Sequence, residues 1–168
     1  MVGFLTLVYY SIINLGGDKM KINTKYFGEV EVVEEKIIEF QEGIPGFEEE
    51  KKFVIINNPD PENPFDWLQA INDPNLSFAI VNPFIVFDDY DIRIPDSAVD
   101  KLKLENKKDI VIYTIVVVPE DVNKMTTNLL GPIVINSKEG LGKQIILDDE
   151  RYTTRHYIFS QNSETGGE

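Results

Sequence analysis

Residues 110–118 (IVIYTIVVV) form the longest strand-like apolar run predicted in the chain, and Thr114 alone interrupts its aliphatic and aromatic side chains. β-Branched and aromatic side chains favour strands. An apolar run without alternation predicts a strand that is buried on both faces. We therefore expect this strand to lie at the centre of a sheet and to form the spine of the core.

The rest of the chain repeats short β-branched and aromatic runs between proline, glycine, asparagine and aspartate. This rhythm is typical of antiparallel sheets, and the turn at residues 72–75 predicts a hairpin with Trp67 and Phe78 on adjacent strands. A helix is predicted only at 95–102, where a proline and acidic residues come first. The fold class is therefore mainly β, a single-domain antiparallel β-barrel-like fold with one short helix. The expected strands are 28–33, 36–40, 52–56, 67–71, 78–81, 84–87, 109–118, 132–136, 142–147 and 157–159.

Composition limits the classes of function. The chain has 168 residues, no cysteine, and 16 basic against 29 acidic residues, for a formal charge of −13. The length suits one domain, and the lack of cysteine excludes disulfides and thiolate chemistry and suits a cytoplasmic protein. The negative charge repels phosphate backbones and anionic lipids. We therefore expect no direct nucleic-acid or membrane binding. The charge favours a basic protein as partner, and the alternative is that it serves only solubility.

The N-terminal segment reads as a leader. Residues 1–15 (MVGFLTLVYYSIINL) are apolar, but they are shorter than the ~18 residues of a membrane-spanning helix and lack signal-peptide flanks. The codons for the residues just before Met20 can spell a ribosome-binding site, so we interpret Met20 as the initiator. An extra apolar strand or helix docked on the domain is the alternative. The chain then divides into a leader at 1–19, one domain at 20–160 and a flexible tail at 161–168.

The segment 84–92 (FIVFDDYDI) is the candidate partner-binding site. Tyrosine offers a large, stiff contact area that also forms hydrogen bonds, and acidic neighbours steer a basic partner. An ordinary solvated turn stays open as an alternative. A calcium site is not expected, because the spacing and central glycine of an EF-hand are missing. The candidate residues are Phe87, Asp88, Asp89, Tyr90 and Asp91.

Two motifs rich in glycine and proline are interpreted as structural. Residues 40–47 (FQEGIPGF) form a rigid loop in which Phe40 and Phe47 are expected to enter the core. Within 127–136 (TNLLGPIVIN), Asn128 is expected to hydrogen-bond its own turn while the aliphatic residues fill the interior. The residues assigned to this structural role are Gly43, Pro45, Gly46, Phe47, Asn128, Leu129 and Pro132.

Catalysis has little support in the sequence. His156 is the single histidine and has basic neighbours, and no Gly-x-Ser-x-Gly nucleophile motif occurs. We therefore predict no catalytic residue, no metal and no cofactor. Acidic residues are abundant, so a small β-barrel ligand-binding protein, or a hydrolase that uses a carboxylate pair, remains the alternative.

Several blocks in order resemble the FliW family of flagellar assembly factors. The resemblance runs from Met20 to about Phe159, and the extension before Met20 is its main departure. The blocks are 24–28 (TKYFG), 40–47 (FQEGIPGF), 67–69 (WLQ) followed by 73–74 (DP), 81–84 (VNPF), 89–90 (DY), 127–136 (TNLLGPIVIN) and 142–144 (GKQ).

The resemblance implies a function as well as a fold. Members of this family are β-barrel-like proteins of the bacterial cytoplasm that bind newly made flagellin. When free of flagellin, they bind the RNA-binding translational regulator CsrA and relieve its repression of flagellin synthesis. We therefore expect a non-enzymatic, protein-binding regulator that is monomeric when free.

Overall fold

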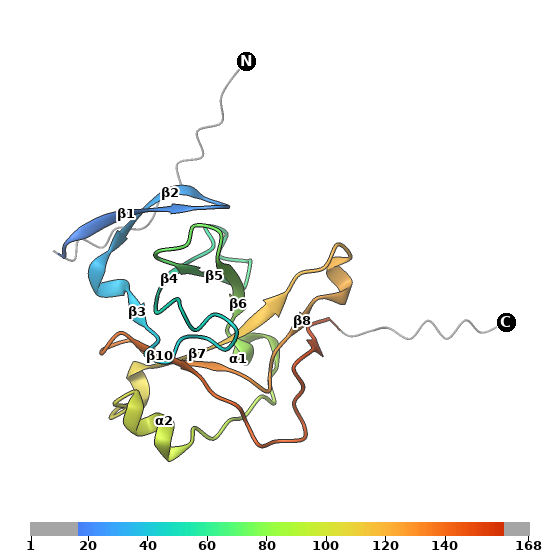
Figure 1. Ribbon diagram of the computed structural model, residues 1–168. Helices are drawn as coiled ribbons and strands as arrows, with labels where there is room; N and C mark the ends of the chain where they lie inside the picture. Colours follow the sequence, from blue (N-terminus) through green and yellow to red (C-terminus); the bar gives the residue numbers. More distant parts are fainter. Residues whose placement is uncertain (1–16, 160–168) are drawn as a thin grey trace.

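The computed structural model describes residues 17–159. Most of the proposed leader and all of the proposed tail therefore lie outside the described residues. Strand β1 (Lys19–Thr24) begins one residue before the proposed initiator, and Met20 pairs with Val32 of β2 (Gly28–Val33). These two strands form a separate antiparallel sheet, which lies above the rest of the molecule in Figure 1.

The larger sheet has nine strands and closes on itself. Its order is β11-β8-β7-β6-β5-β4-β3-β10-β9, and β9 pairs back to β7 to complete a ring (Figure 1). All pairings are antiparallel except the short parallel contact of β3 with β10. The strands are β3 (Ile38–Glu39), β4 (Lys52–Ile56), β5 (Phe65–Ala70), β6 (Ser77–Val81), β7 (Ile110–Val117), β8 (Thr126–Thr127), β9 (Ile133–Asn136), β10 (Leu141–Gln144) and β11 (His156–Tyr157).

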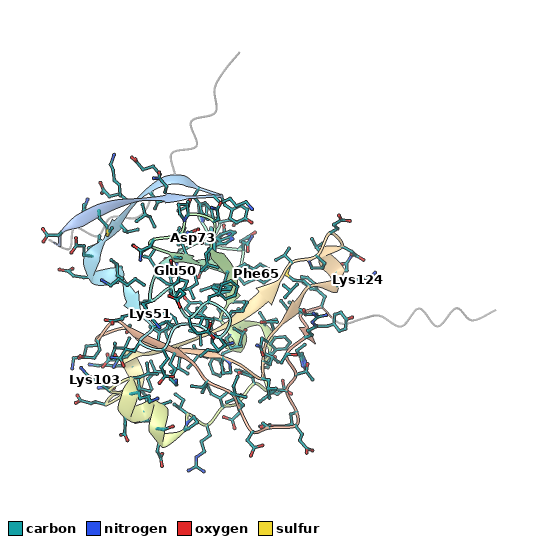
Figure 2. All side chains as sticks on the ribbon, in the orientation of Figure 1. Glu50, Lys51, Phe65, Asp73, Lys103 and Lys124 are labelled. Carbon is teal, nitrogen blue, oxygen red and sulfur yellow. The ribbon has the colours of Figure 1, made fainter. Side chains whose placement is uncertain are left out.

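The central position of β7 is confirmed. Ile112 pairs with Val134 of β9 on the side that closes the ring, whereas Ile80 of β6 pairs with Ile115. Burial ends before the apolar run does, because Val117 and Val118 are 56% and 55% exposed. The expectation of a strand buried on both faces to residue 118 is therefore wrong at its end. There β7 and β8 extend from the ring as a ribbon, with Lys124 near its tip (Figure 2).

Residues 17–159 contain two short α-helices where one was expected. Helix α2 (Asp96–Lys101) matches the prediction, but α1 (Pro83–Val86) replaces the predicted strand at 84–87. The Asn82 side chain accepts a hydrogen bond from the Phe84 amide at 3.0 Å, and proline occupies the first helical turn. An asparagine cap followed by proline is a helix-start signal that outweighs the strand propensity of four apolar residues. The structure also has three 3-10 turns, η1 (Glu34–Lys36), η2 (Lys107–Asp109) and η3 (Val122–Lys124).

Side chains fill the interior of the ring. One buried cluster takes members from β3, β4, β5, β6 and β9, and Phe53, Leu68 and Ile133 in it are fully buried. Figure 2 shows side chains throughout the enclosed space. The β1–β2 sheet covers a second cluster, in which Ile22 and Val30 pack with Val54 of β4. The predicted β5–β6 hairpin is confirmed, because Leu68 pairs with Phe78.

Candidate functional site

The candidate segment begins on α1 and continues into an irregular loop. Phe84 and Ile85 of α1 are 46% and 67% exposed, which is unusual for large apolar side chains on a short helix. Asp88 and Asp89 follow directly and are exposed. Helix α1 thus presents the apolar side chains of Phe84 and Ile85 close in sequence to two exposed carboxylates.

Tyr90 differs from the expectation. Its side chain is only 5% exposed, and its hydroxyl donates a hydrogen bond to the Leu129 carbonyl at 2.9 Å. The ring lies 4.8 Å from Tyr152 and 5.5 Å from Phe84, measured between centroids. Burial raises the pKa of Tyr90, so the hydroxyl remains a donor. The interpretation of Tyr90 as an exposed contact residue is therefore wrong, and the tyrosine instead anchors the loop.

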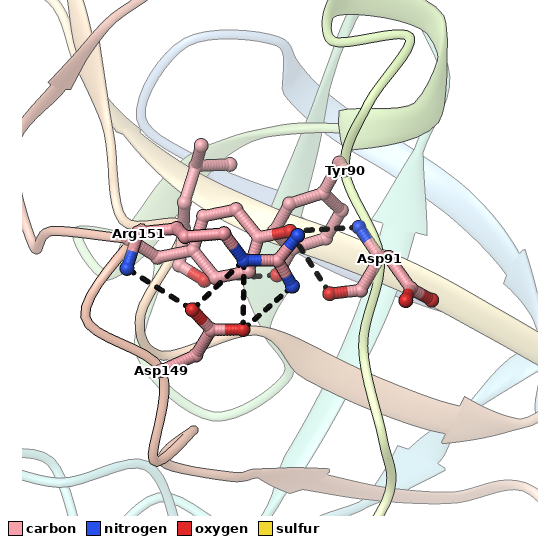
Figure 3. A network of polar contacts seen from close by, with 6 residues as sticks. Tyr90, Asp91, Asp149 and Arg151 are labelled. Carbon is pink, nitrogen blue, oxygen red and sulfur yellow. Dashed lines mark hydrogen bonds and ion pairs between the residues drawn. The ribbon is translucent and has the colours of Figure 1, made fainter.

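Tyr152 joins a second loop to this one by two hydrogen bonds, and Figure 3 shows Asp91 of the first loop near Asp149 and Arg151 of the second. The Tyr152 hydroxyl accepts a hydrogen bond from the Asp91 amide at 2.8 Å and donates one to the Asp91 carbonyl at 3.0 Å. Beside it, Arg151 forms a two-pronged ion pair with Asp149, whose closest approach is 2.7 Å from Nη2 to Oδ2. Hydrogen bonding to Arg151 lowers the pKa of Asp149, and the pair fixes the turn.

The two loops together form what we call the acidic surface. Asp88, Asp89, Asp148 and Glu150 are exposed and have no ion pair within the part of the chain that the structure describes. The sequence indicated only the first of these loops. The second carries a comparable acidic run after an apolar stretch, but its proximity depends on the Tyr152 contact across 61 positions. The acidic surface comprises Asp88, Asp89, Asp91, Asp148, Asp149 and Glu150.

The loop of residues 40–47 is held from several sides. Gly43 and Gly46 have φ angles of +73° and +87°, and Ile44 forms an isolated bridge with Phe47. A Cβ atom at Gly43 would lie 2.6 Å from the Glu48 Cα, so glycine is required there. Phe47 is 43% exposed and packs edge-on against Phe78, which corrects the expectation that it enters the core. Pro45, at the tip of the loop, is exposed.

The second glycine-proline motif connects β8 to β9. Asn128 accepts a hydrogen bond from the Gly131 amide at 2.8 Å, which is the turn contact expected from the sequence. Leu129 is 1% exposed, and the buried Pro132 accepts a hydrogen bond from the Ile145 amide at 2.9 Å. The Leu129 carbonyl is also the acceptor for Tyr90, so this motif supports the acidic surface from beneath.

The described residues give little support for a metal site or a membrane-spanning helix. Across residues 17–159, no three histidine, aspartate or glutamate side chains converge as a metal site would require. No helix in that same range has the length and apolar character needed to cross a bilayer. His156 packs edge-on against Phe87, with ring centroids 5.2 Å apart.

The fold and the two loops together define the class of this protein. It is a mainly β protein in which a closed sheet with a filled interior displays an acidic surface. The family model described as FliW protein matches residues 21–158, and the chain belongs to the FliW family. It is 49% identical over 142 residues to the flagellar assembly factor FliW of Alkaliphilus metalliredigens (strain QYMF), covering 84% of this chain and 88% of that protein. The corresponding protein of Caldicellulosiruptor saccharolyticus (strain ATCC 43494 / DSM 8903 / Tp8T 6331) is 45% identical over 141 residues, with coverages of 84% and 91%.

A solved structure agrees with the sequence comparisons. The crystal structure of a flagellar assembly factor FliW superposes with a TM-score of 0.79 at 40% sequence identity, and the match covers 85% of this chain and 99% of the other. The resemblance deduced from the sequence motifs is therefore confirmed, as is the mainly β fold class.

Proposed function

We propose that this chain is a flagellar assembly factor of the bacterial cytoplasm that regulates by binding proteins and not by catalysis. In this proposal it binds flagellin and, when free of flagellin, binds a CsrA-type RNA-binding translational regulator. Capture of the regulator relieves its repression of flagellin translation. The relatives named above are all flagellar assembly factors, which supports a role of this chain in flagellar assembly.

The acidic surface is the observation that carries the proposal. A protein that binds RNA must present basic residues, because it has to neutralise phosphates. Exposed carboxylates on two loops, in a chain of formal charge −13, provide the complementary field. The apolar side chains of Phe84 and Ile85 at the border of this surface add contact area that charge alone does not supply.

The same field offers a route to antagonism. A bound acidic protein either covers the RNA site of the regulator or brings negative charge close to that site. Negative charge nearby raises the free energy of bringing a phosphate there. Both routes require only a complementary surface, and neither requires a reactive group.

The alternative of a ligand-binding barrel or a hydrolase has less support. Such proteins enclose their ligand in a pocket with converging polar groups. In this chain the interior of the ring is occupied by fully buried apolar side chains such as Phe53 and Leu68. The carboxylates of the acidic surface lie on loops, and all of them except the half-buried Asp149 belong to exposed residues.

A competition experiment with purified proteins tests the proposal. The CsrA-type regulator of the same bacterium is bound to a labelled flagellin leader RNA, and this chain is added. We expect this chain to release the RNA from the regulator. Monomeric flagellin, added next, should bind this chain and so restore RNA binding by the regulator. RNA that stays bound at saturating chain, or flagellin without effect, contradicts the proposal.

A further inference from the structure

We propose that the free edge of β11, with the groove beside it, binds an extended peptide segment as an added strand of the sheet. Apolar side chains of the segment would lie in the groove, and a carboxylate would face Arg155. The inference rests on the proposed function in one respect, since flagellin is taken as the protein that supplies the segment.

Strand β11 ends the large sheet. It pairs with β8 alone, and no strand lies beyond it in the described part of the chain. The Ile158 amide donates to the Met125 carbonyl at 3.1 Å, on the β8 side. Because backbone groups along a strand point alternately to its two edges, the N–H and C=O of Tyr157 point away from β8. Unpaired backbone groups of this kind are a template for another strand.

The surroundings distinguish this edge from the others. In the β1–β2 sheet, lysines and glutamates pair across the strands, as in the contact of Lys21 with Glu29 at 2.6 Å. Charged side chains on an edge discourage pairing with another chain. At β11 no such ion pair is present among the described residues, and two large aromatic side chains are exposed instead, Tyr157 at 49% and Phe159 at 44%.

A groove of about 550 Å³ runs beside β11. Val86 of α1 and Phe87 after it form one wall, and Thr153 with residues 155–159 forms the other. This volume lies within the ~300–1,000 Å³ of typical ligand sites and admits more than one side chain. The apolar and aromatic lining residues are Val86, Phe87, His156, Tyr157, Ile158 and Phe159.

Arg155 indicates the charge of the occupant. It lines the groove, its side chain is exposed, and within residues 17–159 it has no hydrogen bond or ion pair. Arg151, by contrast, is held by Asp149. A free guanidinium in a groove with aromatic and polar walls matches a carboxylate, which it can bind through two parallel hydrogen bonds. The expected segment is therefore extended, apolar and acidic at one position.

The position of the groove would also make flagellin and the proposed regulator compete for this chain. Phe87 lines the groove, and Asp88, the next residue, begins the acidic surface. A strand bound along β11 and a protein bound to the acidic surface would cover neighbouring parts of the molecular surface. Flagellin in the groove would therefore obstruct the regulator, without any change of conformation in the chain.

The test is strand addition by monomeric flagellin from the same bacterium. Hydrogen–deuterium exchange on the full chain should show the Tyr157 amide protected at least about tenfold when flagellin binds, because that amide gains a hydrogen bond. Binding without protection of Tyr157 overturns the inference while leaving flagellin binding intact. No binding by the unaltered chain overturns both the inference and the flagellin part of the proposed function.

Paired variants separate backbone from side chain. Tyr157→Ala removes the ring and keeps the amide, whereas Tyr157→Pro also removes the outward N–H, which the β8 pairing does not use. We expect Tyr157→Pro to bind flagellin about tenfold more weakly than Tyr157→Ala, the effect of one backbone hydrogen bond. Equal affinities of the two folded variants overturn the inference. If Tyr157→Pro does not fold, the hydrogen–deuterium exchange of the unaltered chain provides the test instead.

A charge pair tests the predicted carboxylate. Arg155→Gln should weaken flagellin binding by about threefold at low salt, whereas Arg93→Gln, an equal loss of charge at another exposed arginine, should not. The same result for both variants contradicts the role given to Arg155.

Discussion

Tyr152 holds Asp91 by both of its backbone polar groups, accepting from the amide at 2.8 Å and donating to the carbonyl at 3.0 Å. One hydroxyl thus satisfies two backbone groups of a loop that has no regular structure. Through this contact, the two halves of the acidic surface become one surface.

Removing that hydroxyl should loosen the acidic surface. Tyr152→Phe keeps the packing against Tyr90 but leaves the amide and carbonyl of Asp91 without partners. We expect a loss of about 1–3 kcal/mol in the free energy of unfolding, measured by urea denaturation. Tyr26→Phe is the matched control, because Tyr26 is 61% exposed, and its stability should change by less than about 0.5 kcal/mol. Equal stabilities of the two variants would refute the contact.

The loop of residues 40–47 should not tolerate a side chain at Gly43. Gly43→Ala would place a Cβ atom 2.6 Å from the Glu48 backbone at a φ of +73°, whereas Gly28→Ala meets no atom within 4 Å at a φ of +66°. The control therefore carries the conformational strain alone, about 1–2 kcal/mol. We expect Gly43→Ala to lose more unfolding free energy than Gly28→Ala by at least about 1 kcal/mol. Thermal unfolding of the two variants compares them, and matching losses would show that the loop relaxes freely.

Glu42 should contribute an acid-sensitive part of the stability. Hydrogen bonds from Lys101 and Lys143 lower the pKa of Glu42 from 4.5 to about 2. A lowered folded-state pKa stabilises the fold above the unfolded value of 4.5, and this contribution disappears as the pH falls to about 2. Urea midpoints should therefore separate the unaltered chain from Glu42→Gln at pH 6 and converge towards pH 2. Glu34→Gln, at an exposed position, should show no such convergence. A constant gap for Glu42→Gln would contradict the ion-pair assignment.

Strands were predicted best from the sequence where a local pattern of apolar and turn residues defines them. The bounds of β2 and β4 agree with the expected 28–33 and 52–56, because alternating or continuous apolar runs between turn residues define them. The run at 84–87 became helix α1 because four apolar residues carry no clear period, and the Asn82 cap decided the outcome. Local patterns therefore specify strands in this chain, and caps override them where the pattern is short.

The candidate site was harder to predict than the fold. The exposed aspartates at 88 and 89 were found, but the burial of Tyr90 depends on Leu129, 39 positions away. The second acidic loop was missed for the same reason, since only Tyr152 brings it to Asp91. Phe47 was assigned to the core because an aromatic residue beside glycine and proline gives no sign of which way it faces. Contacts between distant segments decide the orientation of these side chains.

The affinity of this chain for the purified CsrA-type regulator, measured across a range of salt, tests capture by the acidic surface. Neutralising Asp88, Asp89, Asp148 and Glu150 together to their amides removes four charges from the acidic surface. The control variant neutralises Glu34, Glu35, Glu105 and Glu120, which are exposed on other parts of the chain. We predict at least about tenfold weaker binding for the first variant, little change for the second, and falling affinity of the unaltered chain as salt rises. Binding that ignores salt and is equal in both variants would contradict capture by the acidic surface.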